Sequence, residues 1–106
     1  MDNKPICKID EEGNKRWYLG YKFHRLDGPA IEYPDGHKQW WINGKLHRLD
    51  GPAYIGVYGN KNWYINNHHV TLQITKWAKE NNIHLDNLTE VDIALIKLVW
   101  AEYRIK

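Results

Sequence analysis

Trp40-Trp41-Ile42-Asn43-Gly44-Lys45-Leu46-His47-Arg48-Leu49-Asp50-Gly51-Pro52-Ala53 is the stretch that decides the fold, because nearly the same sequence precedes it. Residues 17–30 read Trp-Tyr-Leu-Gly-Tyr-Lys-Phe-His-Arg-Leu-Asp-Gly-Pro-Ala, and a third copy starts at Trp63 and breaks off after His69. Tryptophan recurs at positions 17, 40 and 63, and glycine at 13, 36 and 59, so the period is 23 residues. A fixed period of this size indicates a stack of supersecondary units.

Each unit contains the signal of a β-hairpin. Asn43-Gly44 is the strongest two-residue hairpin turn, Gly20-Tyr21 at the same place suits a type II′ turn, and Asn66-Asn67 stands there in the third unit. Asp-Gly-Pro then interrupts the outgoing strand, so a loop is expected at residues 25–28 and 48–51. We therefore predict an antiparallel meander of five or six strands over residues 5–71. A half repeat ending at Gly13 is expected to begin it.

From Thr71 the pattern changes to that of helices. Thr71 is expected to cap a first helix in which Ile74, Trp77 and Ala78 share one face, and Asn81-Asn82 to end it. The prediction is a single α+β domain over residues 1–106, with the repeat sheet at 5–71 and a helical tail at 72–106. The two helices are expected to pack on the sheet or to be arranged for dimerisation.

The second helix is expected to start at Thr89, with Asp92 completing a capping box, and to run to about Arg104. Its polar stripe is narrow, and apolar residues occupy most of its circumference. They are Val91, Ile93, Leu95, Ile96, Leu98, Val99, Trp100 and Tyr103. So wide an apolar arc needs two surfaces to cover it. One is the rest of the domain, and a second copy or another protein is expected to supply the other.

The composition narrows the classes of partner and compartment. The 106 residues include 15 Lys and Arg against 13 Asp and Glu, and this near balance argues against binding of long nucleic acid. The single cysteine, Cys7, excludes an internal disulfide and fits a reducing compartment. The sequence has neither a membrane-spanning apolar run nor a signal-peptide core, so a cytoplasmic protein without membrane contact is expected.

The phrase W-x-x-N-G-x-x-H-R-x-D-G-P-A with its period of 23 resembles the short MORN-like β-hairpin repeats, in the variant common in phage, giant-virus and some bacterial proteins. Residues 13–71 carry the resemblance. Gly20 departs from the usual Asn, and the third unit lacks the His-Arg-x-Asp-Gly-Pro-Ala half. The resemblance implies a stacked-hairpin sheet used for binding, and a phage origin.

The repeated polar residues are interpreted as a structural turn motif. It comprises His24, Asp27, Gly28 and Pro29, and again His47, Asp50, Gly51 and Pro52. An active site needs its acid or base once, whereas a repeated motif serves each unit alike. Asp is expected to cap the turn's amides, Arg to pair with it, and His to span the hairpin. A hydrolase built on His and Asp is the less favoured reading, and no catalytic residue is predicted.

Neither a metal nor a cofactor is predicted. Equivalent histidines of successive hairpins should lie about 9.5 Å apart, at ~4.8 Å per strand, which is too far for two of them to share a zinc ion.

The aromatic pairs are the predicted binding surface. Neighbours on a strand face opposite ways, so Trp17, Trp40 and Trp63 should line one face of the sheet and Tyr18, Trp41 and Tyr64 the other. Such rings and arginines dominate protein interfaces. The predicted partner-binding residues are Tyr18, Trp41, Tyr64, Arg25, Arg48, Trp100 and Tyr103.

The leading functional hypothesis is a non-catalytic binding protein, a small phage-type inhibitor that occupies a site on a host protein, for instance a defence protein. Homodimerisation through the C-terminal helix is a further expectation. The alternative is a module that binds a nucleotide or single-stranded nucleic acid on the same aromatic and arginine surface.

Overall fold

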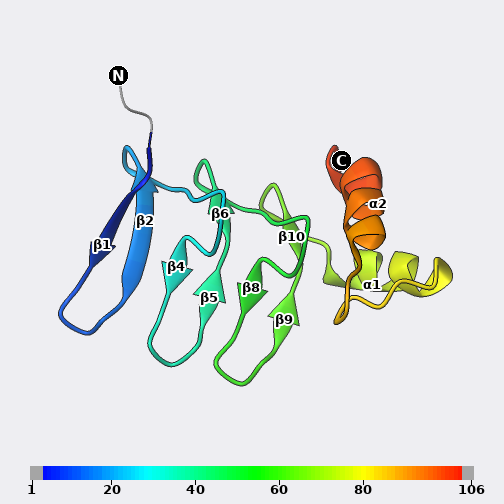
Figure 1. The fold of residues 1–106 in the computed structure, drawn as a ribbon, viewed down its shortest axis with the longest axis horizontal. Coiled ribbons are helices and arrows are strands. Elements are labelled where there is room, and N and C mark those ends of the chain that lie inside the picture. The colour runs from blue at the N-terminus through cyan, green and yellow to red at the C-terminus, as the bar shows by residue number, and fades with distance from the viewer. Residues whose placement is uncertain (1–3, 104–106) are drawn as a thin grey trace.

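The computed structural model describes residues 4–103 and confirms the α+β fold class. The hairpin units follow one another along the long axis of the molecule, and both helices lie beyond the last unit (Figure 1). The N-terminal strand and the helices therefore stand at opposite ends of the array. In the described part of the chain, no helix lies over the sheet of the first two complete units (Figure 1).

The strands are shorter and more numerous than expected, because the chain leaves the ladder at each repeated loop. They are β1 (Ile6–Ile9), β2 (Lys15–Leu19), β3 (Lys22–Phe23), β4 (Ile31–Glu32), β5 (Lys38–Gln39), β6 (Trp41–Ile42), β7 (Lys45–Leu46), β8 (Tyr54–Ile55), β9 (Lys61–Asn62), β10 (Tyr64–Ile65) and β11 (His68–His69). The main sheet has the order β1-β2-β4-β5-β8-β9, with β3 also paired to β2, and β6-β7 and β10-β11 form separate hairpins. Every pairing is antiparallel.

Three turns on one side of the array share the same backbone bonds at the 23-residue period. The amides of Asp10, Tyr33 and Gly56 each donate to the carbonyl four residues on, at 3.1, 2.9 and 2.8 Å. The glycine three residues after each donates back and has a positive φ, +86° at Gly13, for example. β-Branched or bulky residues rarely adopt this conformation, so the periodic glycine is required there. The predicted half repeat at the N-terminus is thereby confirmed.

The turns on the other side of the array differ as their sequences predict. In the first unit only Gly20 has a positive φ, +66°, as a type II′ turn requires. In the second unit Asn43 and Gly44 have φ of +50° and +78°, and in the third Asn66 and Asn67 have +50° and +70°. Two consecutive positive values are typical of a type I′ turn. Different residue pairs thus reverse equivalent hairpins.

Helix α1 spans Thr71–Glu80 and α2 spans Glu90–Trp100. The expectation that Thr71 caps α1 is wrong. Val70 is the N-cap without a side-chain bond, and the Thr71 hydroxyl instead accepts from the Trp63 amide at 2.8 Å. The capping box of α2 is confirmed, since the Thr89 hydroxyl accepts from the Asp92 amide at 3.1 Å and the Asp92 carboxylate accepts from the Thr89 amide. The helix ends four residues before Arg104, which lies outside the described residues.

The largest buried cluster joins the last hairpin to the two helices. It consists of Trp63, Ile65, Val70, Ile74, Ile96 and Trp100. Trp77 packs against this cluster and Ala78 is buried, so the predicted inner face of α1 is confirmed. The helices therefore close the C-terminal end of the array, where they cover Trp63, and leave the sheet of the preceding units uncovered by helix. Terminal capping of this kind is what a stack of repeats needs.

Candidate functional site

The arginine of each complete repeat lies on the tryptophan of the same repeat. The Arg25 guanidinium carbon is 4.3 Å from the centroid of the Trp17 ring, and that of Arg48 is 3.9 Å from Trp40. The same guanidinium groups donate through Nε to Asp27 and Asp50, at 2.9 Å in both repeats. These contacts combine cation–π attraction with a charge-assisted hydrogen bond.

The rest of the motif fits around this arginine. Arg48 Nη1 donates to the carbonyl of Pro52 at 3.0 Å, as Arg25 does to Pro29 at 3.1 Å. A Cβ on Gly51 would stand 2.5 Å from the Arg48 guanidinium carbon, so glycine leaves the space that the arginine occupies. Aspartate here holds the arginine through Oδ1, and no bond from a turn amide to Asp27 or Asp50 accompanies it in the described residues. The expectation that Asp caps the turn is therefore corrected.

The histidine of the motif connects one repeat to the next. His24 Nδ1 accepts from the amide of Asn43 at 2.9 Å, and His47 Nδ1 accepts from that of Asn66 at 3.1 Å. The donating amide lies 19 residues after the histidine in both cases, in the turn of the following hairpin. The prediction that His spans its own hairpin is therefore wrong. Burial lowers the pKa of His47, which favours the neutral ring that can accept this bond.

The third unit shows why the motif stops where it does. Thr71 stands 23 residues after Arg48, at the start of α1, and Trp63 is only 3% exposed because the helices cover it. In the first two repeats an arginine covers the equivalent ring. The helical cap thus replaces the arginine, and the motif residues serve contacts within and between units.

The opposite face of the sheet carries rows of stacked rings. Tyr18, Phe23 and Trp41 stand in one row, with centroid separations of 5.2 and 5.4 Å, and Tyr33, His37 and Tyr54 in a second, at 4.8 Å each. Tyr64 and His69 are stacked at 4.8 Å in the last hairpin. We call these eight rings the aromatic face. All are half-buried except His69, which is exposed.

Polar contacts fix the aromatic face in place. The Trp41 indole N–H donates to Gln39 at 2.8 Å, and the Gln39 amide lies 3.0 Å from His37 Nε2. Two cations stand over rings of this face, Lys8 Nζ at 5.6 Å from the Tyr18 centroid and Arg16 at 5.7 Å from that of Tyr33. The rings are therefore ordered before any partner arrives.

The structure separates the predicted partner-binding residues into groups. Tyr18, Trp41 and Tyr64 belong to the aromatic face, but Arg25 and Arg48 lie against Trp17 and Trp40 and are used within their repeats. The sequence analysis expected these arginines and the rings to share one surface. Arg25 and Arg48 instead lie on the other side of the sheet, because they stack on Trp17 and Trp40, whose side chains point away from Tyr18 and Trp41.

The two predicted contact residues near the C-terminus are part of the packed helical end. Trp100 is 7% exposed and packs edge-on against Trp77, so it belongs to the core and leaves little surface for the partner contact that the sequence predicted. Tyr103 is half-buried and stacks on Trp100 at 5.0 Å. The exposed part of α2 is instead formed by other apolar residues, of which Val91 and Leu98 are the most exposed.

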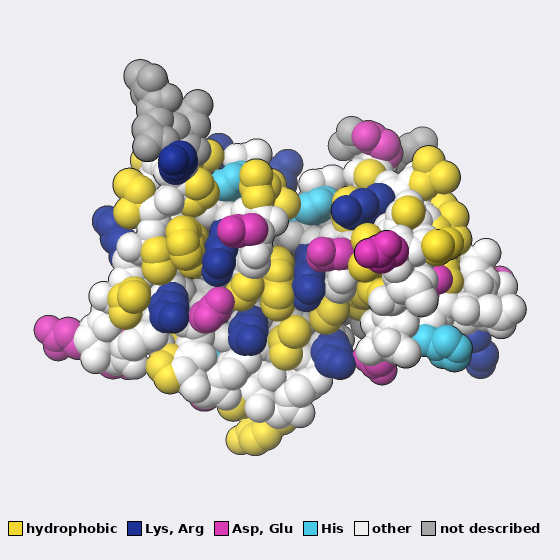
Figure 2. Space-filling model, in the orientation of Figure 1, with side chains coloured by type: hydrophobic (Ala, Val, Ile, Leu, Met, Phe, Trp, Pro, Cys, Tyr) yellow, Lys and Arg dark blue, Asp and Glu magenta, His cyan; other side chains and the backbone are white. Residues whose placement is uncertain are grey.

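Two hollows of about 400 and 530 Å³ lie on the side of the tryptophan–arginine pairs. The smaller is lined by Arg25 and Trp40 and the larger by their equivalents 23 residues on, Arg48 and Trp63. Charged side chains around the larger one are paired, Arg48 with Asp50 and Lys61 with Asp86 at 3.2 Å. Figure 2 shows basic side chains beside acidic ones at intervals across the repeats. We interpret the hollows as gaps between consecutive units.

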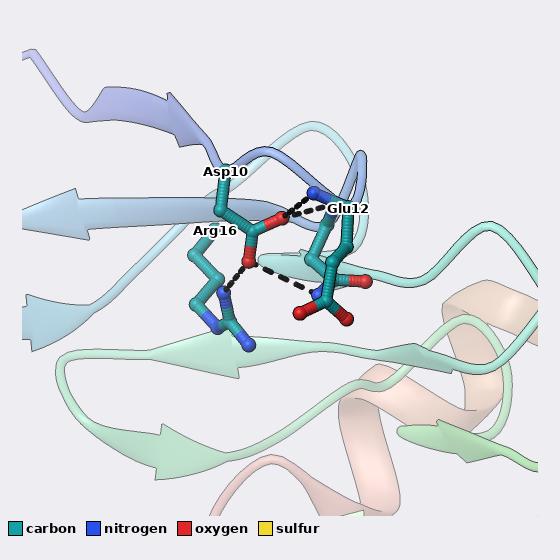
Figure 3. A network of polar contacts seen from close by, with 4 residues as sticks. Asp10, Glu12 and Arg16 are labelled. Carbon is teal, nitrogen blue, oxygen red and sulfur yellow. Dashed lines mark hydrogen bonds and ion pairs between the residues drawn. The ribbon is translucent and has the colours of Figure 1, made fainter.

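The first turn holds the most strongly shifted carboxylate. Asp10 accepts from the amides of Glu12 and Asn14 and from Arg16 Nη1, each at 3.0 Å (Figure 3). Chiefly the bond from the Asn14 amide, with help from Arg16, lowers its pKa to about 2. This network stabilises the turn of the N-terminal half repeat. Asp10 is exposed and its contacts are local, so the network needs no catalytic explanation.

Within residues 4–103, no three His, Cys, Asp or Glu side chains are grouped so that they could hold a metal ion. No helix of that range is long and apolar enough to cross a bilayer.

Comparison of the chain with protein-family models, curated proteins and solved structures finds no match. The resemblance to MORN-like repeats accordingly remains a prediction from the sequence motif.

The sequence predicts that intervening strands add Tyr33 and Tyr54 to the aromatic rows, as the structure shows, but it did not point to Phe23, His37 or His69. One signal could have found Phe23. A two-residue turn at 20–21 places residue 23 opposite Tyr18. The stacking of His37 between two tyrosines had no equivalent signal, because it depends on the register of β4, β5 and β8.

Proposed function

We propose that this protein is a non-catalytic binding module that occupies a site on another protein through its aromatic face. One observation carries the proposal: eight rings are stacked in fixed rows on a sheet surface that the described helices do not cover. Preordered Tyr and Trp side chains give contact area with little further loss of side-chain entropy. Large aromatic residues are also the ones that dominate binding energy at interfaces.

The use of the repeated polar residues supports the same proposal. His24, Arg25 and Asp27 are bonded inside the array, and their copies 23 residues later make the same bonds. Because both copies of the motif make the same internal bonds, their role is structural. The binding surface is therefore formed by residues outside the motif. In keeping with the resemblance to MORN-like repeats, we propose a cytoplasmic, phage-type inhibitor that blocks a host protein sterically.

The test is affinity capture with the full chain and two variants. Wild-type protein immobilised in a lysate of a bacterial host should retain one protein in stoichiometric amount. Tyr33→Ala/Tyr54→Ala removes the two rings that flank His37 and should abolish retention. Lys38→Ala, an exposed change on the opposite face, is the matched control and should retain the partner. Equal retention by all three proteins, or none by the wild type, contradicts the proposal, provided that circular dichroism shows both variants folded.

The cations over the aromatic face favour a second candidate, a nucleotide or a single-stranded nucleic acid. Arg16 and Lys8 stand above two of the rings, and base stacking on an aromatic side chain contributes about 1–3 kcal/mol. A nucleotide inserted there should quench tryptophan fluorescence through Trp41. Quenching that is present in wild type and absent in Trp41→Phe would support this candidate, and a flat titration with mononucleotides and oligonucleotides would remove it.

A further inference from the structure

The outer side of α2 carries an apolar stripe that the rest of the described chain leaves open. Val91 and Leu98 are 76% and 81% exposed, and Ala94 between them is also exposed. The spacing of three and four residues places them on one side of the helix. Ile96 and Trp100, on the other side, are buried in the core. Hydrophobic side chains gather over α2 on the flank away from the sheet (Figure 2).

We propose that this stripe binds a second copy of the chain, with the two α2 helices antiparallel across a two-fold axis near Ala94. The charges beside the stripe identify the occupant. Glu90 and Lys97 are exposed, stand seven residues apart and border the same edge of the stripe, where Lys97 also lines the smaller hollow. A two-fold interface brings a surface against itself, so its charge pattern must be its own complement.

Antiparallel pairing satisfies that condition. With the axis at Ala94, Glu90 lies four residues before it and Lys97 three after it, so Glu90 meets Lys97 of the partner subunit with an offset of ~1.5 Å along the helix. Val91 meets Leu98 of the partner subunit with the same offset. Ala94 is small, so the two helices can approach closely where they cross. Parallel pairing would instead place the edge that carries Glu90 and Lys97 against the opposite edge of the partner's stripe, so these two charges would not meet.

The inference is independent of the proposed function, because Val91, Ala94 and Leu98 are not part of the aromatic face. A failure of one therefore does not imply a failure of the other. Pairing of the two α2 helices also explains why α2 has apolar residues around most of its circumference. One side packs on the last hairpin and α1, and the other packs on the second copy.

The test is the molar mass of the full chain by size exclusion with light scattering, over a wide range of concentrations. Wild type should shift from the monomer mass towards twice that mass as concentration rises. Leu98→Glu should stay monomeric throughout, and at concentrations where wild type is also monomeric it should have the same melting temperature, because the residue is exposed. The matched control is Leu72→Glu on α1, where the leucine is 82% exposed, and it should dimerise like wild type. A monomeric wild type, or a dimer that Leu98→Glu leaves intact, overturns the proposal.

Charge reversal tests the arrangement itself. Glu90→Lys and Lys97→Glu should each weaken dimerisation about ten-fold, since each replaces two attractive pairs by repulsive ones. The double variant restores both pairs in the swapped sense and should dimerise nearly as well as wild type. A double variant weaker than either single change would exclude the antiparallel pairing.

Discussion

Replacement of Gly51 by alanine probes the contact that defines each repeat. The new Cβ would lie 2.5 Å from the guanidinium carbon of Arg48 and 2.7 Å from its Nη1, so the arginine must leave its place on Trp40. Its departure removes a cation–π contact of about 1 kcal/mol and the hydrogen bond to Pro52, worth about 1 kcal/mol more. The pair with the half-exposed Asp50 adds little. We expect a loss of about 2 kcal/mol in the free energy of unfolding.

A double-mutant cycle in urea shows whether the arginine is the cause. Arg48→Ala removes the same contacts, so it should also destabilise by about 2 kcal/mol, and Gly51→Ala should then add almost nothing in its background. Gly28→Ala, where the distance is 2.9 Å, should be milder than Gly51→Ala. If the losses from Gly51→Ala and Arg48→Ala add up in the double variant, the glycine is not making room for the arginine and the reasoning is refuted.

Three further predictions concern the cap, the bridge between repeats and the first turn. Thr89→Ala removes the capping box of α2 and should destabilise by about 1 kcal/mol in thermal unfolding, whereas Thr75→Ala on the exposed side of α1 should not. The pKa of His47 is lowered from 6.5, so its contribution to stability should be complete above pH 6.5 and decline as the pH falls below that value. In urea unfolding, His47→Ala should flatten this pH dependence. An unchanged dependence would show that another group is responsible. The pKa of Asp10 is lowered from 3.8 to about 2, so its contribution to stability should persist down to about pH 3.8 and disappear towards pH 2. Acid unfolding of Asp10→Asn beside wild type measures this contribution. Coinciding unfolding curves would contradict the network in the first turn.

The repeat architecture could be predicted from the sequence because its determinants are local. The period of 23, the turn pairs such as Asn43-Gly44 and the periodic glycines fix backbone geometry within a few residues, and the structure has these turns where they were expected. The capping box at Thr89 is equally local. The structural role of the motif was also foreseen, although not every bond within it.

The errors arose where the outcome depends on contacts between distant segments. His24 and His47 bond to the next hairpin, which no rule of local spacing indicates. Arg25 and Arg48 were assigned to the wrong face because their side chains fold back onto tryptophans eight residues earlier. Trp100 was expected at an interface because the side of α2 that packs on the last hairpin cannot be recognised when most of the helix is apolar.

The most direct test of the account is the melting temperature of a chain with a second copy of residues 37–59 inserted after Gly59. If each 23-residue unit is held by contacts within itself and with its neighbours, the insertion adds one intrinsic and one interface contribution, and the chain should unfold cooperatively at a higher temperature than wild type. A lower melting temperature, or loss of cooperative unfolding, would show that the repeated residues do not form a self-sufficient unit.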